Sequence, residues 1–340
     1  MQRKVPPKLG RAAIATALLL SAMWGLNIVG IKVALKAFPP IWNAFWRLLL
    51  GWPLLWAWAR QGGVRLKPLP GETGPLVALG VFFAIQIIML NISIDWTTAG
   101  FASVLLNAAP VFINTFAHFF VPGDHLSRQR LAGLGLAFGG VAIVFLGQPD
   151  PSLASRPVLG NILAFLTAAV IGGRMVYTQR LVQRMHSTRV IFWQVGFSLP
   201  VFLLGAAIFE PMMVGPLTLG PLLSWLYCSF GVVGIAFVLW IRLLETNSPA
   251  LLSVFVFPTP IFGVLFSALV YSEMLPAELI IGVLCVAFGI LIVMLEKRHQ
   301  ELETRAQQAS RAPSPEPAQP VLARQGRGEP EVVGACRSDG

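Results

Sequence analysis

The sequence predicts an all-α integral membrane protein with ten transmembrane helices, arranged as two inverted five-helix repeats. Composition is the first of three observations behind this prediction. Of 340 residues, 56% are hydrophobic and 12% are charged, against roughly 25% charged residues in a soluble domain. The second is segment length, since a helix that crosses about 30 Å of hydrocarbon needs about 20 apolar residues. Such stretches follow one another from Ala12 to Leu295, and the third observation is that they repeat.

Hydropathy, together with charged residues and Pro/Gly breaks, predicts where each span begins and ends. The expected spans are 12–33, 41–59, 74–94, 99–120, 130–147, 158–179, 189–209, 220–242, 249–271 and 276–295. They divide the chain into a cytoplasmic N-terminal tail (1–11), a first repeat (12–147), a second repeat (158–296) and a C-terminal tail (297–340). The last segment is polar and Pro-rich, so we expect a disordered cytoplasmic tail.

The repeat is visible within the chain itself, because adding 147 to 150 to a residue number often returns the same residue type. The matching pairs are Gly25 and Gly172, Phe45 and Phe192, Trp46 and Trp193, Asp95 and Glu245, Ser103 and Ser253, Pro110 and Pro260, Asp124 and Glu273, Gly133 and Gly282, and Gly140 and Gly289. Each copy holds five spans, an odd number. The second copy must therefore enter the membrane upside down relative to the first, a plan that recurs in secondary transporters.

Lys and Arg residues in the short loops predict the orientation, since cytoplasmic loops carry an excess of them. With the N-terminus inside, the two non-cytoplasmic basic residues are Lys36 and Arg156. The cytoplasmic set has fifteen members: Arg3, Lys4, Lys8, Arg11, Arg60, Arg65, Lys67, Arg128, Arg130, Arg180, Arg184, Arg189, Arg242, Lys297 and Arg298. Both termini are therefore expected in the cytoplasm. The net charge of +10 lies at span ends and in the tail, which argues against a nucleic-acid partner.

Two groups of motifs resemble the EamA-type branch of the drug/metabolite transporter superfamily. The first is Trp24-Gly25-Leu26-Asn27 with Lys32, Pro39-Pro40 and Phe45-Trp46-Arg47. The second is a proline followed about four helical turns later by an acid, then by a Gly-rich span, and it occurs twice: Pro110 with Asp124, and Pro260 with Glu273. The resemblance covers residues 12 to 296, with Asp124 in place of the family's usual Glu. It implies a secondary transporter of the bacterial inner membrane that exports small metabolites, such as amino acids, by alternating access.

Pro110 and Pro260 are candidate hinges, because a proline in mid-span leaves a backbone carbonyl without its helical donor. A fixed kink without movement is the alternative at both positions. Gly135 and Gly139 have the small-xxx-small spacing that lets helices approach closely, which favours packing over function.

Polar groups inside spans are the candidate substrate-binding residues, because lipid cannot satisfy them. Only Arg47 and Arg174 are charged and lie well inside apolar sequence, although each is near enough to a span end to snorkel to the interface. Other members could hold helices together instead of lining a path. The expected set is Trp24, Asn27, Arg47, Asn91, Asn107, Arg174, Tyr177 and Gln194.

Acidic residues lie only at the ends of the predicted spans, so the two arginines favour a carboxylate or another anionic group over an organic cation. The four histidines and three cysteines lack metal or nucleophile spacing, and there is no phosphate-binding loop. We therefore expect no enzyme activity, cofactor or metal. The expected partners are a small-molecule substrate and the lipid bilayer, and a homo-oligomer is left open. Efflux of drug-like compounds and a non-transporting membrane sensor or scaffold are the alternative functions.

Overall fold

The structure is a computed structural model, and it describes residues 10–120, 127–212, 215–246, 257–273 and 275–311. All regular elements in these ranges are helices. The chain forms two units, residues 1–300 and 301–340, and the bundle described below belongs to the first. The helices in the described residues are α1 (Arg11–Ala34), α2 (Pro40–Gln61), α3 (Thr73–Trp96), α4 (Ala99–Leu106), α5 (Ala109–Phe120), α6 (Arg128–Leu146), α7 (Pro157–Val182), α8 (Ser187–Phe209), α9 (Leu219–Leu226), η1 (Tyr227–Ala236), α10 (Phe237–Thr246), α12 (Thr259–Tyr271) and α13 (Ala277–Arg311).

Eight helical segments are long and apolar enough to cross a membrane within the described residues. Two of the predicted spans fall outside this set. The helix α2 carries Arg47 and Arg60, and α12 has only 13 described residues, since the first part of predicted span 249–271 lies outside the described ranges. The predicted tail also differs, because α13 continues as a helix to Arg311, while residues 312–340 are not described.

The fourth predicted span is broken into two helices. Helix α4 ends at Leu106 and α5 begins at Ala109, and the side chain of Asn107 donates to the Ser103 carbonyl at the break. Pro110 stands in the first turn of α5, where its missing N–H costs nothing. Pro260 likewise stands in the first turn of α12. Both candidate hinges therefore lie in the first turn of a helix, and the one at Pro110 follows the break at Asn107.

The eighth predicted span also departs from a regular α-helix. Its middle, η1, is a π-helix of 10 residues between α9 and α10. π-Helices occur mostly as single turns inside α-helices, and such turns are frequent at functional sites. It packs against α1 and α2, where Gly30 faces the Cys228 sulfur and Gly51 faces Val233.

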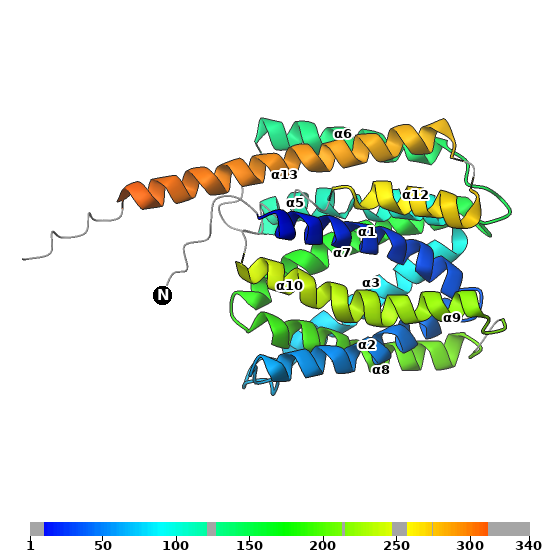
Figure 1. Cartoon of the computed structure of the whole chain (residues 1–340), viewed down its shortest axis with the longest axis horizontal. Helices are drawn as coiled ribbons and strands as arrows, with labels where there is room; N and C mark the ends of the chain where they lie inside the picture. The colour runs from blue at the N-terminus through cyan, green and yellow to red at the C-terminus, as the bar shows by residue number, and fades with distance from the viewer. Residues whose placement is uncertain (1–9, 121–126, 213–214, 247–256, 274, 312–340) are drawn as a thin grey trace, which may run out of the picture. The chain divides into compact units, whose positions relative to one another are not determined.

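Two antiparallel seams join the repeats. In the first, α6 lies along α13 (Figure 1): Gly133 faces the Gly289 carbonyl and Gly140 faces the Gly282 carbonyl. A Cβ on Gly133 or Gly140 would approach that oxygen to 2.8 Å, so only glycine permits this close approach. Since Gly133 corresponds to Gly282 and Gly140 to Gly289, each repeat makes the same contact with the other.

The second seam joins α2 and α8, which are also neighbours in Figure 1. At one end, the Glu210 carboxylate accepts from the Ile41 backbone N–H at 3.0 and 2.9 Å and caps α2. At the other end, Arg189 at the start of α8 pairs with Glu72 at 2.9 Å. Glu210 directly follows α8, whereas Glu72 directly precedes α3. In both cases a carboxylate of one repeat holds the start of the other repeat's second helix.

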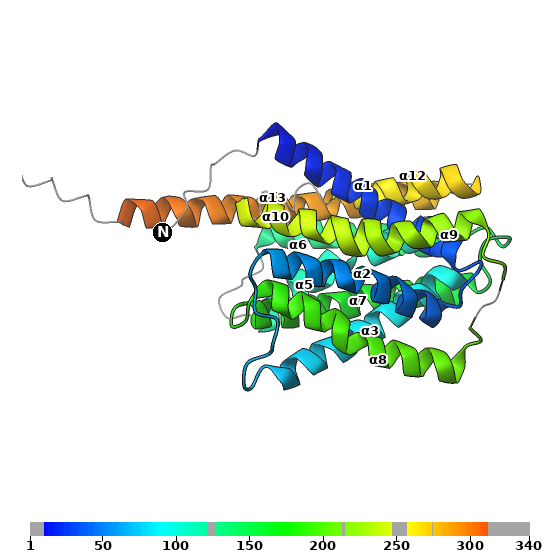
Figure 2. The same ribbon diagram turned by 60° about the horizontal axis from the view of Figure 1, so that its bottom comes forward.

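A third pair of equivalent contacts lies where α1 meets α12 and where α7 meets α5. A Cβ on Gly25 would approach Gly263 N and Phe262 Cβ to 2.8 Å, and one on Gly172 would approach Phe112 Cβ to 2.6 Å. Phe112 and Phe262 are themselves related by an offset of 150. Figure 2 shows α1 crossing α12 obliquely, and glycine permits that crossing.

Candidate functional site

The bundle is closed at the end where α1 finishes and α4 begins, called here the Lys32 end. The Lys32 ammonium donates to the carbonyls of Ile94, Asp95 and Thr97, each at 2.8 Å. These carbonyls belong to the last turn of α3 and the residue after it, which lack helical donors of their own. The cation therefore ties α1 to α3 where the α3 dipole is negative.

A buried carboxylate reinforces the same end. Glu273, just after α12, accepts a hydrogen bond from the Ser267 hydroxyl. Its oxygens lie against Gly100, and a Cβ there would be 3.1 Å from Oε2. Because Gly100 is in the first turn of α4, the negative charge faces the positive end of that helix dipole. Glu273 and Asp95 also act electrostatically on the Lys32 ammonium.

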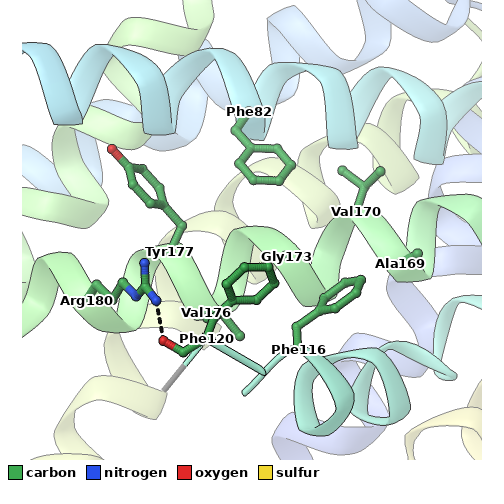
Figure 3. Close-up of a pocket in the computed structure, with 9 residues that line it drawn as sticks. All are labelled: Phe82, Phe116, Phe120, Ala169, Val170, Gly173, Val176, Tyr177 and Arg180. Carbon is green, nitrogen blue, oxygen red and sulfur yellow. Dashed lines mark hydrogen bonds between the residues drawn. The ribbon is translucent and has the colours of Figure 1, made fainter. Parts of the chain in front are cut away.

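The opposite end, called here the Arg180 end, holds a cavity between α3, α5 and α7. It has a volume of about 440 Å³, and Figure 3 shows Phe82, Phe116, Val170 and Tyr177 around it. A second cavity of about 530 Å³ shares Phe120, Tyr177 and Arg180 with the first and extends to Arg184. The space is apolar in depth and basic at its rim, where Arg180 donates to the Phe120 carbonyl.

Of the predicted substrate-binding residues, Tyr177 lines this cavity. Its hydroxyl donates to the Pro75 carbonyl at 3.2 Å. Trp24 lies elsewhere, edge-to-face with Trp240 at 5.3 Å between ring centroids. Asn91 is fully buried, accepts from Asn43 at 3.0 Å and donates to the Ile87 carbonyl, which is a contact between helices α2 and α3.

Arg174 and Gln194 are brought together. The Arg174 guanidinium donates to Gln194 Oε1 at 2.9 Å and to Gln86 Oε1, and it lies over the Phe83 ring at 5.3 Å. Three helices, α7, α8 and α3, thus meet at one guanidinium whose acceptors are side-chain amides. Gln86 was not among the predicted residues, although a glutamine in the apolar run of α3 is the same signal that selected Gln194.

Arg47 and Asn27 are brought to a second place, beside η1. Arg47 is 4% exposed and lies against the Cys228 thiol, so it does not snorkel. The Cys228 thiol in turn donates to the backbone carbonyl of Asn27, and its sulfur lies 3.8 Å from that oxygen. Within the part of the chain that the structure describes, Arg47 Nε and Asn27 Oδ1 are buried without a hydrogen-bond partner.

Comparison with known proteins agrees with this architecture. The model of the EamA-like transporter family matches residues 11–146 and 158–295, and these ranges coincide with the two repeats. A solved crystal structure shares the fold at 20% identity, with a TM-score of 0.62 over 84% of this chain and 99% of that chain.

Two relatives match over almost their whole length. An uncharacterized transporter of Archaeoglobus fulgidus is 29% identical over 292 residues, which are 82% of this chain and 95% of that protein. A probable amino-acid metabolite efflux pump of Escherichia coli is 29% identical over 293 residues, 81% of this chain and 92% of that protein. The family model covers well over half of the sequence, once in each repeat, and the chain therefore belongs to the EamA-like transporter family.

Proposed function

We propose that this protein is a secondary transporter of the cell inner membrane that exports small metabolites, amino acids or related organic solutes, by alternating access. The name of the Escherichia coli relative, a probable amino-acid metabolite efflux pump, supports the substrate class. The single observation that carries the proposal is the asymmetry between the two ends of the bundle. One end is closed by Lys32 and Glu273, and the other contains a cavity.

The topology proposed for this transporter has ten spans in two inverted repeats. To the eight candidate spans it adds α2 and the segment that ends with α12. The antiparallel courses of α6 along α13 and of α2 along α8 support the inversion, since each of these pairs joins equivalent helices. The excess of basic residues at the Arg180 end supports a cytoplasmic location for that end and for both termini. The structure then corresponds to a state open toward the cytoplasm.

Filling the cavity tests the proposal. Val170 lines the cavity, whereas Val158 on the same helix is 67% exposed. An export screen over amino acids, organic acids and lipophilic cations would compare wild type, Val170→Trp and Val158→Trp at matched membrane levels. We expect wild type and Val158→Trp to export a shared set of solutes and Val170→Trp to lose at least about 10-fold in rate, because the indole would fill the path.

The two alternatives predict different outcomes of the same screen. Movement of lipophilic cations without any amino or organic acid would favour efflux of drug-like compounds. No difference between wild type and cells without the protein, across the whole panel, would overturn transport and favour a membrane sensor or scaffold.

A further inference from the structure

Arg47 is the most conspicuous buried charge that the closed and open ends of the bundle do not use. It lies seven residues after the start of α2, about 10 Å along the helix axis. Its side chain is inside protein at that depth, and its neighbour is a thiol. Burying a guanidinium without a counter-charge costs several kcal/mol, so such a group in a membrane protein indicates a ligand that supplies the charge.

The second repeat contains a matched control for this site. The offset of 147 that relates the repeats takes Asn27 to Arg174 and Arg47 to Gln194. Each copy therefore has one arginine and one amide on its first two helices, but the arginine has changed helix. In the second copy the guanidinium of Arg174 has built-in acceptors, the oxygens of Gln86 and Gln194. In the first copy, none of the residues that the structure describes supplies an acceptor to Arg47 Nε or a donor to Asn27 Oδ1.

The surroundings of Arg47 provide an independent sign of function. Cys228, which touches both Arg47 and Asn27, is the second residue of the π-helix η1. Asn27 is on α1 and Arg47 is on α2, and each of these helices has a glycine where η1 packs closely against it. A Cβ on Gly30 of α1 would be 2.9 Å from the Cys228 sulfur, and a Cβ on Gly51 of α2 would be 3.1 Å from the Ser229 carbonyl oxygen.

We propose that Arg47, Asn27 and Cys228 form a binding site for the head group of an α-amino acid, closed in this state. The Arg47 guanidinium binds the carboxylate, for which its planar donors are suited. Asn27 Oδ1 accepts from the ammonium group. The inference rests on the proposed function and extends it, because it assigns the carboxylate and the ammonium group of the solute to named atoms.

Cys228 is a native reporter of this site. The sequence has two other cysteines, Cys285 and Cys336, so the variant Cys285→Ser/Cys336→Ser leaves a single thiol. In reconstituted vesicles, this thiol would be labelled with methanethiosulfonates that carry a sulfonate or a trimethylammonium group. We expect the anionic reagent to react at least about 10-fold faster than the cationic one. In a low dielectric, a guanidinium a few ångströms away strongly attracts the sulfonate and repels the trimethylammonium group.

Three variants in this background assign the selectivity. Arg47→Gln should abolish the preference for the anionic reagent, and Arg47→Lys, which keeps the charge, should retain it. Arg60→Gln is the matched control, because Arg60 is on the same helix but lies over the exposed Trp56 ring, and it should retain the preference as well. Monodisperse elution in detergent separates loss of selectivity from loss of folding. A preference that survives in Arg47→Gln, or a Cys228 that never reacts in any folded variant, overturns the proposal.

L-Alanine and propionate are the probes for the two halves of the head group, since they differ in the ammonium. Both should slow the labelling of Cys228, and L-alanine should protect more strongly. In Asn27→Leu this difference should disappear while protection by propionate remains. Lack of protection by both probes overturns the site even if the export screen finds transport. Protection without any transport in that screen would instead retain the site and remove the proposed function.

Discussion

Replacing Lys32 with methionine should open the Lys32 end of the bundle. The ammonium makes three charge-assisted hydrogen bonds, each at 2.8 Å, and such bonds contribute about 1.5 kcal/mol or more apiece. Halving the sum, because these bonds are only part-buried, leaves about 2 kcal/mol of preference for the closed end. A loss of about 2 kcal/mol raises the population of the open state about 30-fold.

Labelling of Cys228 from outside the cell measures this opening, because the thiol is 1% exposed in the closed state. In the Cys285→Ser/Cys336→Ser background, we expect a membrane-impermeant maleimide to react about 30-fold faster with Lys32→Met than with the parent. Lys36→Met is the control: Lys36 is one turn further on and contacts only the Tyr271 ring among its described interactions, at 5.2 Å. Equal rates in the parent and Lys32→Met, or equal acceleration by both substitutions, would refute the assignment of Lys32 as the group that holds this end closed.

Three further predictions concern the seams and their ends. Gly140→Ala should lower the unfolding free energy in detergent by about 1 to 3 kcal/mol, because its Cβ would overlap the α13 backbone. In the control Gly135→Ala the new Cβ meets no atom within 4 Å, so the unfolding free energy should change by less than about 0.5 kcal/mol. Equal effects of the two substitutions would contradict the close contact between α6 and α13. Arg189→Met should lower the unfolding free energy by about 3 kcal/mol, because it leaves the Glu72 carboxylate buried without this partner. Adding Glu72→Gln should recover part of this loss in a double-mutant cycle. Strictly additive losses would argue against the pairing. Burial raises the pKa of Glu210 above its ordinary value, so the folded state binds this proton more tightly than the unfolded state, and the free energy of unfolding should fall as the pH rises from the ordinary pKa to the raised one. Between about pH 4 and pH 8, the unfolding temperature should therefore depend less on pH in Glu210→Gln than in wild type. The same pH dependence in both proteins would contradict this.

Helix positions were largely predictable from the sequence, because length and hydropathy act on every residue of a span. The predicted span 158–179 lies inside α7 (Pro157–Val182), and 189–209 lies inside α8 (Ser187–Phe209). Irregularities within spans were not predictable in the same way. The interruption at Asn107 and the π-helix from Tyr227 to Ala236 depend on packing against neighbouring helices, which leaves no trace in hydropathy.

Polar positions inside the spans can be listed from the sequence, but the partners of their side chains could not be predicted. Nothing in the sequence distinguishes Asn91, which is satisfied by Asn43, from Asn27, whose side-chain oxygen has no partner among the described residues. Lys32 belongs to a sequence motif, but its hydrogen bonds to the end of α3 could not be predicted, because they depend on where α3 ends in space. Pairings between distant helices decide both cases, and only the fold supplies them.

The arrangement of polar contacts divides the bundle into interfaces that should stay fixed and interfaces that should move. Glu210 holds the seam between α2 and α8 at one end. At the other end Arg189 ties the start of α8 to Glu72, directly before α3, and glycine-on-backbone contacts hold α6 to α13. By contrast, the polar contact that the structure describes between α1 and α3 at the Lys32 end is made by one side chain, Lys32. Opening that end breaks a few hydrogen bonds, whereas opening either seam would expose close-packed backbone or separate buried charges. We therefore expect alternating access to pivot about the two seams, with the α1–α3 contact as the part that opens.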